Sequence, residues 1–164
     1  MLSMLASCGL ILFVFESFLP VLPWFRPGLG NIATILALMF FGFGDALKVT
    51  LLRVFLGALV LGRLFSPIFI FALFGGIAST LVMALAMKRT GNVFSPVGIS
   101  VLGAFVHNIV QLYLAYLLFV KSTEIFIFIP VFTIAAVVTG IITGLISAII
   151  RDKSAKRLGF DTGE

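Results

Sequence analysis

Three polar residues, His107, Asn108 and Gln111, lie in the middle of an apolar stretch that covers residues 97–120. A helix that crosses a membrane needs about 20 such residues. On a helix, His107 and Gln111 share a face at a spacing of four, as do Asn108 and Gln111 at a spacing of three. A polar side chain at membrane depth is costly unless something binds it. Two interpretations stay open: hydrogen bonds between transmembrane helices, or the wall of a ligand pocket.

Two charged residues in other apolar segments are candidates for the same pocket. Arg53 lies at membrane depth and requires a partner or water there. It is predicted either to bind an anion near His107 or to contact backbone carbonyls or Asp45. Glu16 lies near the outer end of the first apolar segment, where it either shapes the entrance of the pocket, pairs with Arg63 or is solvated at the membrane interface.

Residues 24–31 form a loop that contains one Pro and two Gly residues and precedes a short apolar segment. A backbone of this kind can re-enter the membrane and line a cavity. The amides of the helix that follows favour an anion. Trp24 either lines the site or anchors the loop at the membrane interface. The predicted substrate-binding set is therefore Glu16, Trp24, Asn31, Arg53, His107, Asn108 and Gln111.

The sequence lacks the residue patterns that catalysis or cofactor binding requires. It has one His and one Cys, which excludes a thiol metal site and a disulfide framework. It has no Walker A loop for ATP, no Asp-rich motif for magnesium diphosphate, and no nucleophile–base arrangement. We therefore predict that the chain is not an enzyme and uses no cofactor or metal.

The composition is that of an integral membrane protein. Hydrophobic residues make up 62% of the chain and charged residues 10%, whereas soluble domains have about 25% charged residues. The net charge of +5 comes from Lys and Arg between apolar blocks and in the tail. This distribution is typical of a membrane topology signal and argues against a nucleic-acid partner.

Pro and Gly clusters divide the chain into apolar segments of helical length. We predict an all-α bundle of six transmembrane helices in residues 1–150, followed by a basic cytoplasmic tail in residues 151–164. An excess of Lys and Arg on the side that holds both termini predicts that both are cytoplasmic, in the plasma membrane of a prokaryote. The predicted helices cover residues 2–19, 29–43, 46–65, 68–87, 97–120 and 125–150.

Small residues recur at every fourth position in two of these segments. Such ridges let helix backbones approach closely. They are predicted to pack inside the bundle, and the alternative is a docking face for another membrane subunit. The ridges are Ala72, Gly76, Thr80 and Ala84, and Ala136, Gly140, Gly144 and Ala148.

Four segments, in this order, resemble the family of heptaprenyl diphosphate synthase component I, also called Gx transporter proteins. The family usually has Ala where Gly30 stands. The segments are FESFLP (residues 15–20), PGLGNI (27–32), LRVFLG (52–57) and GISVLGAFVHNIVQ (98–111).

That family in turn resembles the S components of energy-coupling factor (ECF) transporters. The resemblance implies a six-helix protein that captures a small solute from outside and works with a transmembrane coupling subunit and ATPase subunits. The alternative, which the family's name implies, is a non-catalytic membrane partner of a prenyl diphosphate synthase. The predicted partners are accordingly a solute, membrane lipid and one of these two sets of subunits.

Overall fold

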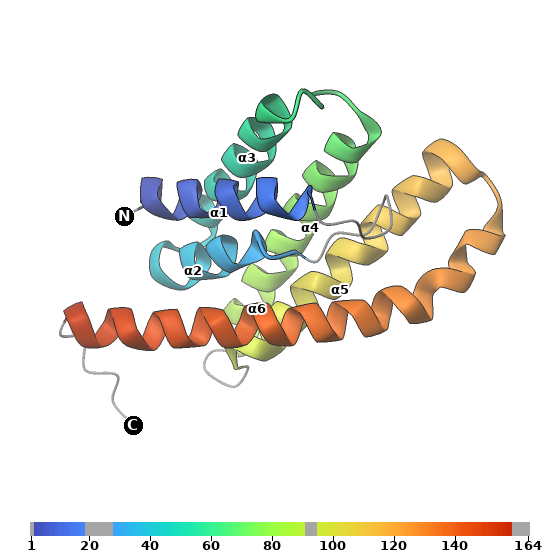
Figure 1. The fold of residues 1–164 in the computed structure, drawn as a ribbon. Helices are drawn as coiled ribbons and strands as arrows, with labels where there is room; N and C mark the ends of the chain where they lie inside the picture. The colour runs from blue at the N-terminus through green and yellow to red at the C-terminus, as the bar shows by residue number, and fades with distance from the viewer. Residues whose placement is uncertain (1, 19–27, 91–94, 159–164) are drawn as a thin grey trace.

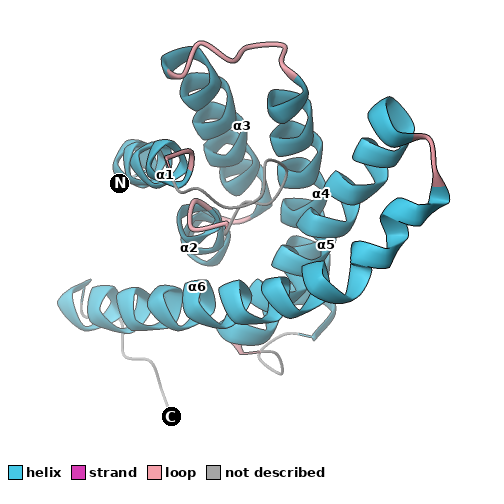
Figure 2. Cartoon of the chain, turned by 45° about the vertical axis from the view of Figure 1, so that its right-hand side comes forward, coloured by secondary structure: helices cyan, strands magenta, loops and turns pink. Residues whose placement is uncertain are grey.

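The computed structural model describes residues 2–18, 28–90 and 95–158, and all regular structure in these ranges is helical (Figures 1 and 2). The predicted all-α class is confirmed. A π-helical turn, η1 (Tyr116–Val120), and a 3-10 helix, η2 (Thr123–Phe128), lie between the last two α-helices. The α-helices are α1 (Leu2–Glu16), α2 (Asn31–Phe41), α3 (Phe43–Val60), α4 (Pro67–Thr90), α5 (Pro96–Ala115) and α6 (Ile129–Leu158).

Three helical segments are long and apolar enough to cross a membrane: Pro67–Arg89, Pro96–Val120 and Thr123–Ser154. The apolar helices α1 and α2 are shorter. With 11 residues, α2 is about 16 Å long, roughly half of the hydrocarbon thickness of about 30 Å. The six predicted segments therefore do not all have spanning length, because α2 on its own is too short.

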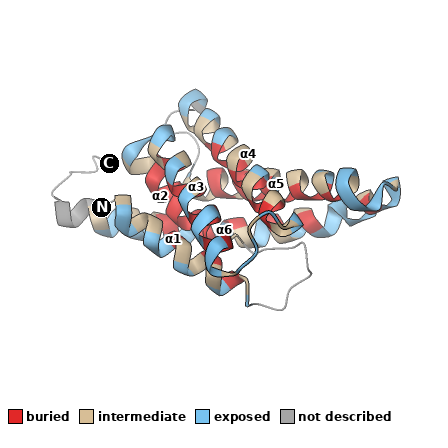
Figure 3. Ribbon diagram, turned by 90° about the horizontal axis from the view of Figure 1, so that it is seen from above, coloured by how far each residue is buried: buried red, intermediate tan, exposed pale blue. Residues whose placement is uncertain are grey.

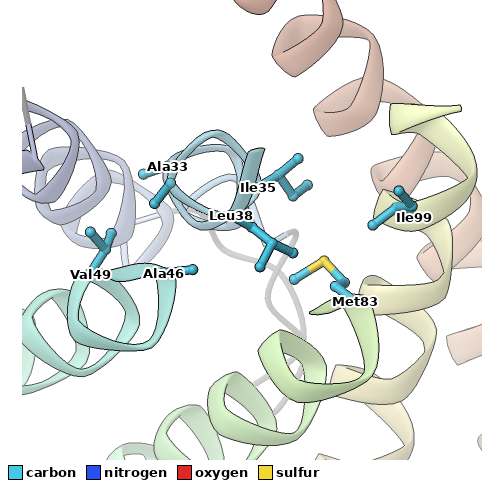
Figure 4. Close-up of a cluster of buried hydrophobic side chains, with 8 residues drawn as sticks. Ala33, Ile35, Leu38, Ala46, Val49, Met83 and Ile99 are labelled. Atoms are coloured by element: carbon cyan, nitrogen blue, oxygen red, sulfur yellow. The ribbon is translucent and has the colours of Figure 1, made fainter. Parts of the chain in front are cut away.

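The short helix α2 is the centre of the packing. It contacts each of the other five α-helices, and its first eight residues are all buried. Because protein surrounds it, its short length and irregular ends are tolerated at membrane depth. Figure 4 shows this apolar core, which consists of Ala33, Ile35, Ala37 and Leu38 of α2, Ala46 and Val49 of α3, Met83 of α4 and Ile99 of α5.

The small-residue ridge of α6 packs against α5. A Cβ atom at Gly140 would lie 2.5 Å from the Cα of Val101, and one at Gly144 would lie 2.6 Å from the Cα of Val97. These distances leave no room for a side chain. The predicted packing role of this ridge is confirmed.

The ridge of α4 packs against α3 and adds hydroxyl contacts. A Cβ atom at Gly76 would lie 2.9 Å from Cγ2 of Thr50. The Thr50 hydroxyl lies 3.1 Å from that of Thr80 on α4 and 2.9 Å from that of Thr34 on α2. This chain of buried hydroxyls joins three helices, and hydrogen bonds of this kind hold helices together in membranes.

Buried residues gather where the helices meet, while exposed residues cover the periphery (Figure 3). On α6 the exposed side chains are largely aliphatic, such as Ile134, Val138 and Leu145. An apolar surface of this extent suits contact with lipid chains rather than water.

The last helix departs most from its predicted bounds. It was expected to end at residue 150 and to give way to a tail, but α6 continues to Leu158. The change from apolar to charged residues at Arg151 predicts the end of the membrane segment. Because Arg, Lys and Ala are good helix formers, the same change does not end the helix. The first turn of α1 and the last turn of α6 lie toward the same side of the molecule (Figure 1).

Candidate functional site

Four of the predicted site residues surround one small hollow. Glu16 comes from the end of α1, Asn31 from the start of α2, Arg53 from α3 and His107 from α5. The hollow has a volume of about 10 Å³, which is room for about one water molecule. Four segments far apart in the sequence therefore bring polar groups to one point in the core.

Arg53 is 4% exposed and is held by a side chain of α2. Its Nη2 donates a hydrogen bond to Oδ1 of Asn31 at 2.6 Å. The predicted alternative of a contact with Asp45 is wrong, because Asp45 instead forms a salt bridge of 2.8 Å with Lys48. Gly30 lies against the guanidinium, since a Cβ atom there would overlap Nη1 of Arg53.

Glu16 is 5% exposed and contacts the loop that leads into α2. Its carboxylate accepts a hydrogen bond from the backbone N–H of Leu29. Gly28, with φ of +76°, turns the backbone at this point, and its carbonyl accepts a hydrogen bond of 2.8 Å from the backbone N–H of Asn31. A positive φ of this size favours glycine. Leu29 and Asn31 thus contact the carboxylate of Glu16 and the guanidinium of Arg53, which lie beside the same hollow.

The three polar residues of α5 make different contacts. His107 faces the hollow, and its Nε2 lies 3.0 Å from Nε2 of Gln111. The Nδ2 of Asn108 donates a hydrogen bond of 3.2 Å to the carbonyl of Phe132 on α6. Asn108 therefore joins two helices, as one of the two interpretations predicts. Gln111 supports His107 from the next turn of α5.

Close backbone approach confines the imidazole of His107 on its other side. A Cβ atom at Gly75 of α4 would lie 2.9 Å from Nδ1 of His107. The Oε1 atom of Gln111 is buried and has no hydrogen-bond partner among the residues that the structure describes. Neither the Gly75 contact nor the Arg53–Asn31 bond was predicted, although glycines at helix-contact positions are the signal that points to such close approach.

Two predicted residues, Asn108 and Gln111, do not line the hollow. Trp24 falls outside the residues that the structure describes. Within the described ranges, no group of three His, Cys, Asp or Glu side chains is placed to hold a metal ion. The site offers charge and hydrogen bonding in a buried setting, through one carboxylate, one guanidinium, one amide and one imidazole.

The chain was also compared with known proteins. The model of the family described as heptaprenyl diphosphate synthase component I matches residues 5–150, from α1 to the end of the apolar part of α6. No curated protein and no solved structure gives a match. The family's description is that of one component of a synthase, which agrees with the prediction that the chain is not itself the enzyme. Because the match covers most of its length, the chain belongs to the heptaprenyl diphosphate synthase component I family.

Proposed function

We propose that this chain is the membrane-embedded, non-catalytic partner subunit of a prenyl diphosphate synthase. The family description supports a partnership of this kind, and the length of α6 carries the structural argument. Its 30 residues make a helix about 45 Å long, whereas the hydrocarbon core is about 30 Å thick. About 15 Å of helix therefore projects beyond the hydrocarbon. Its charged end, residues 151–158, is here called the handle, and it offers a soluble partner a rigid surface to bind.

The charge of the handle indicates which surface it binds. Residues 151–158 contain four basic residues and one acidic residue, a net charge of +3. An acidic patch on the synthase would complement this charge and steer association. Lys and Arg also favour the cytoplasmic side of a bacterial plasma membrane, which is where we place both termini.

Reversing the charge of the handle tests the proposal. The variant Lys153→Glu/Lys156→Glu/Arg157→Glu and the wild type would be purified from membranes, and the prenyl diphosphate synthase of the same organism would be titrated onto each. We expect the reversal to weaken association by about tenfold or more, because repulsion replaces attraction. Lys121→Glu, at the exposed turn before η2, is the control and should bind normally. Equal affinity of the synthase for all three proteins would refute the proposal that the handle binds it.

A second candidate function is solute capture, as in an ECF S component with a coupling subunit and ATPases. It is favoured by the convergence of buried Glu16, Asn31, Arg53 and His107 on one hollow. Because the hollow has room for about one water molecule, a larger solute requires the helices to move apart. Asn108 and Gln111 would then position His107 and α6 rather than touch the solute.

Copurification separates the two functions. A transporter subunit should bring down ATPase subunits and bind a solute that Arg53→Ala and His107→Ala no longer bind. A synthase partner should bring down the synthase, and these two variants should retain it once folded. Solute binding that survives both substitutions would rule out the hollow as the solute site.

A further inference from the structure

Two apolar grooves of nearly equal size lie at different places on the molecule. The first, here called the lysine groove, has a volume of about 540 Å³ and lies between the α2–α3 junction and the last turns of α4, with Lys88 in its lining. The second, the glutamate groove, has a volume of about 550 Å³ and lies at the turn between α5 and α6, with Glu124 in its lining. The two grooves offer similar apolar space but opposite charge.

The lysine groove is open along one face of α4. Leu81, Leu85 and Lys88 follow one another at spacings of four and three, which places them on the same side of that helix. Leu81 and Leu85 are 44% and 49% exposed. From Leu81 to Lys88 the groove runs about 10 Å along the helix. It therefore presents an apolar track that ends at a cation.

The α2–α3 junction keeps the opposite wall open. Gly42 joins the two helices with φ of +84°, and a Cβ atom there would meet nothing within 4 Å. Phe43, which follows, also lines the groove and is 42% exposed. The wall is apolar and has free space next to Gly42, as the binding of a hydrocarbon chain requires.

The charge at the mouth of the groove favours an anionic headgroup. Lys88 and Arg89 lie in the last turn of α4. Asp45, in the first turn of α3, forms a salt bridge of 2.8 Å with Lys48, so its charge is already matched. Lys88 is the cation in the groove lining that is placed to contact a bound headgroup, whereas Arg89 lies outside the lining. The glutamate groove would repel the same headgroup.

The geometry points to the lysine groove as a binding site for a prenyl diphosphate, with the isoprenoid chain on the apolar track and the diphosphate at Lys88. This inference rests on the proposed function, which supplies a partner that makes such a molecule. Only residues 91–95 separate α4 from α5, and the start of α5 packs against Gly144 of α6. The mouth of the groove and the projecting handle therefore lie toward the same side, where a bound synthase would release its product.

Binding of tritiated geranylgeranyl diphosphate to the full chain in phosphatidylcholine nanodiscs tests the inference. Saturable binding is expected for the wild type. Lys88→Gln should weaken it by about tenfold or more, which is the range for loss of a hydrogen bond to a charged group. Arg89→Gln removes the same charge one residue away but outside the groove lining, and should weaken binding by less than about threefold. Equal losses in the two variants would show diffuse surface charge and overturn the site.

Variants that fill the grooves provide a second test. Ala84→Phe places a ring in the lysine groove and should abolish binding, whereas Ile127→Phe in the glutamate groove should leave it unchanged. Helical circular dichroism and a single gel-filtration peak would establish that both variants fold. If Ala84→Phe fails to fold, Lys88→Gln decides, because Lys88 is exposed and its replacement leaves the core intact.

Competition identifies the ligand. Unlabelled geranylgeranyl diphosphate should displace the label, whereas geranylgeraniol, inorganic pyrophosphate and phosphatidylglycerol at equal concentration should not. Displacement by phosphatidylglycerol would show a general lipid site and overturn the inference. A chain that retains the synthase but binds no prenyl diphosphate overturns the inference alone. A chain that binds the diphosphate but no synthase overturns the proposed function alone.

Discussion

The bond between Arg53 and Asn31 should be among the most important polar contacts of the fold. Replacing Asn31 by Ala removes the acceptor of a 2.6 Å hydrogen bond from a guanidinium that is 4% exposed. A buried hydrogen bond to a charged group contributes about 1.5–3 kcal/mol. For a chain of this size, 1 kcal/mol corresponds to about 2–4 °C in Tm. We therefore expect Asn31→Ala to lower Tm by about 3–12 °C.

Thermal unfolding in detergent, followed by circular dichroism at the helical band, measures this difference. Asn108→Ala is the matched control, because it removes a neutral hydrogen bond of 3.2 Å to the carbonyl of Phe132. Neutral bonds between membrane helices contribute about 0.6 kcal/mol on average, so the expected loss is about 1–3 °C. A loss for Asn108→Ala as large as that for Asn31→Ala would refute the reasoning.

A double-mutant cycle isolates the pair. Arg53→Lys removes the planar donor group but keeps the charge. If the bond is the main interaction of Asn31, adding Asn31→Ala to Arg53→Lys should cost much less than Asn31→Ala costs alone. Additive losses would mean that Asn31 acts through another contact.

Two further substitutions test the helix contacts. Gly144→Leu should lower stability by about 1–3 kcal/mol or prevent folding, since even a Cβ atom would lie 2.6 Å from the Cα of Val97. Fluorescence-detected gel filtration after heating measures this loss. Gly44→Ala is the control and should behave like the wild type, because a Cβ atom at Gly44 would meet nothing within 4 Å. Thr50→Val should lower stability by about 1–2 kcal/mol, because it removes the hydroxyl that lies between those of α2 and α4; an unchanged Tm in the same assay would show that this chain of hydroxyls adds nothing to stability.

The helices whose starts could be predicted best are those that begin at a proline. Pro67 and Pro96 begin α4 and α5, within a residue of the predicted starts. Ser95 caps α5 by accepting a hydrogen bond of 3.2 Å from the amide of Gly98, which reinforces the start. Proline at the first position of a helix and a capping hydroxyl before it are local signals, so the sequence alone is sufficient to locate them.

The place of α2 could not be predicted in the same way. Hydropathy reports that residues 29–43 are apolar, and it does not report whether lipid or protein surrounds them. The difference depends on contacts with five other helices, which are properties of the whole fold. The same limit applies to α6: hydropathy predicts the end of the membrane segment at Ile150, whereas the helix continues to Leu158.

In the site, helical spacing predicted part of the arrangement. His107 and Gln111 share a face and do contact each other. Consecutive residues on a helix are about 100° apart, so Asn108 points to α6 while His107 points to the hollow. Depth along the helices predicts that Arg53 lies near His107, whereas Glu16 and Asn31 join the predicted set as the entrance and the loop before the short apolar segment; all four line the hollow. The direct bond of Arg53 to Asn31 depends on the path of the loop through Gly28 and Gly30, which spacing along the chain does not encode.

The two candidate functions make opposite demands on the hollow. Solute capture requires Glu16, Arg53 and His107 to separate, so that a molecule larger than one water molecule can enter. A synthase partner requires only that they hold α1, α3 and α5 together, while the lysine groove and the end of α6 serve the partner. Opening the hollow would break buried hydrogen bonds such as that of Arg53 to Asn31, and leaving buried polar groups without partners is costly. In the closed arrangement these hydrogen bonds therefore stabilise one packing of the helices, which is what a membrane partner with a fixed handle needs.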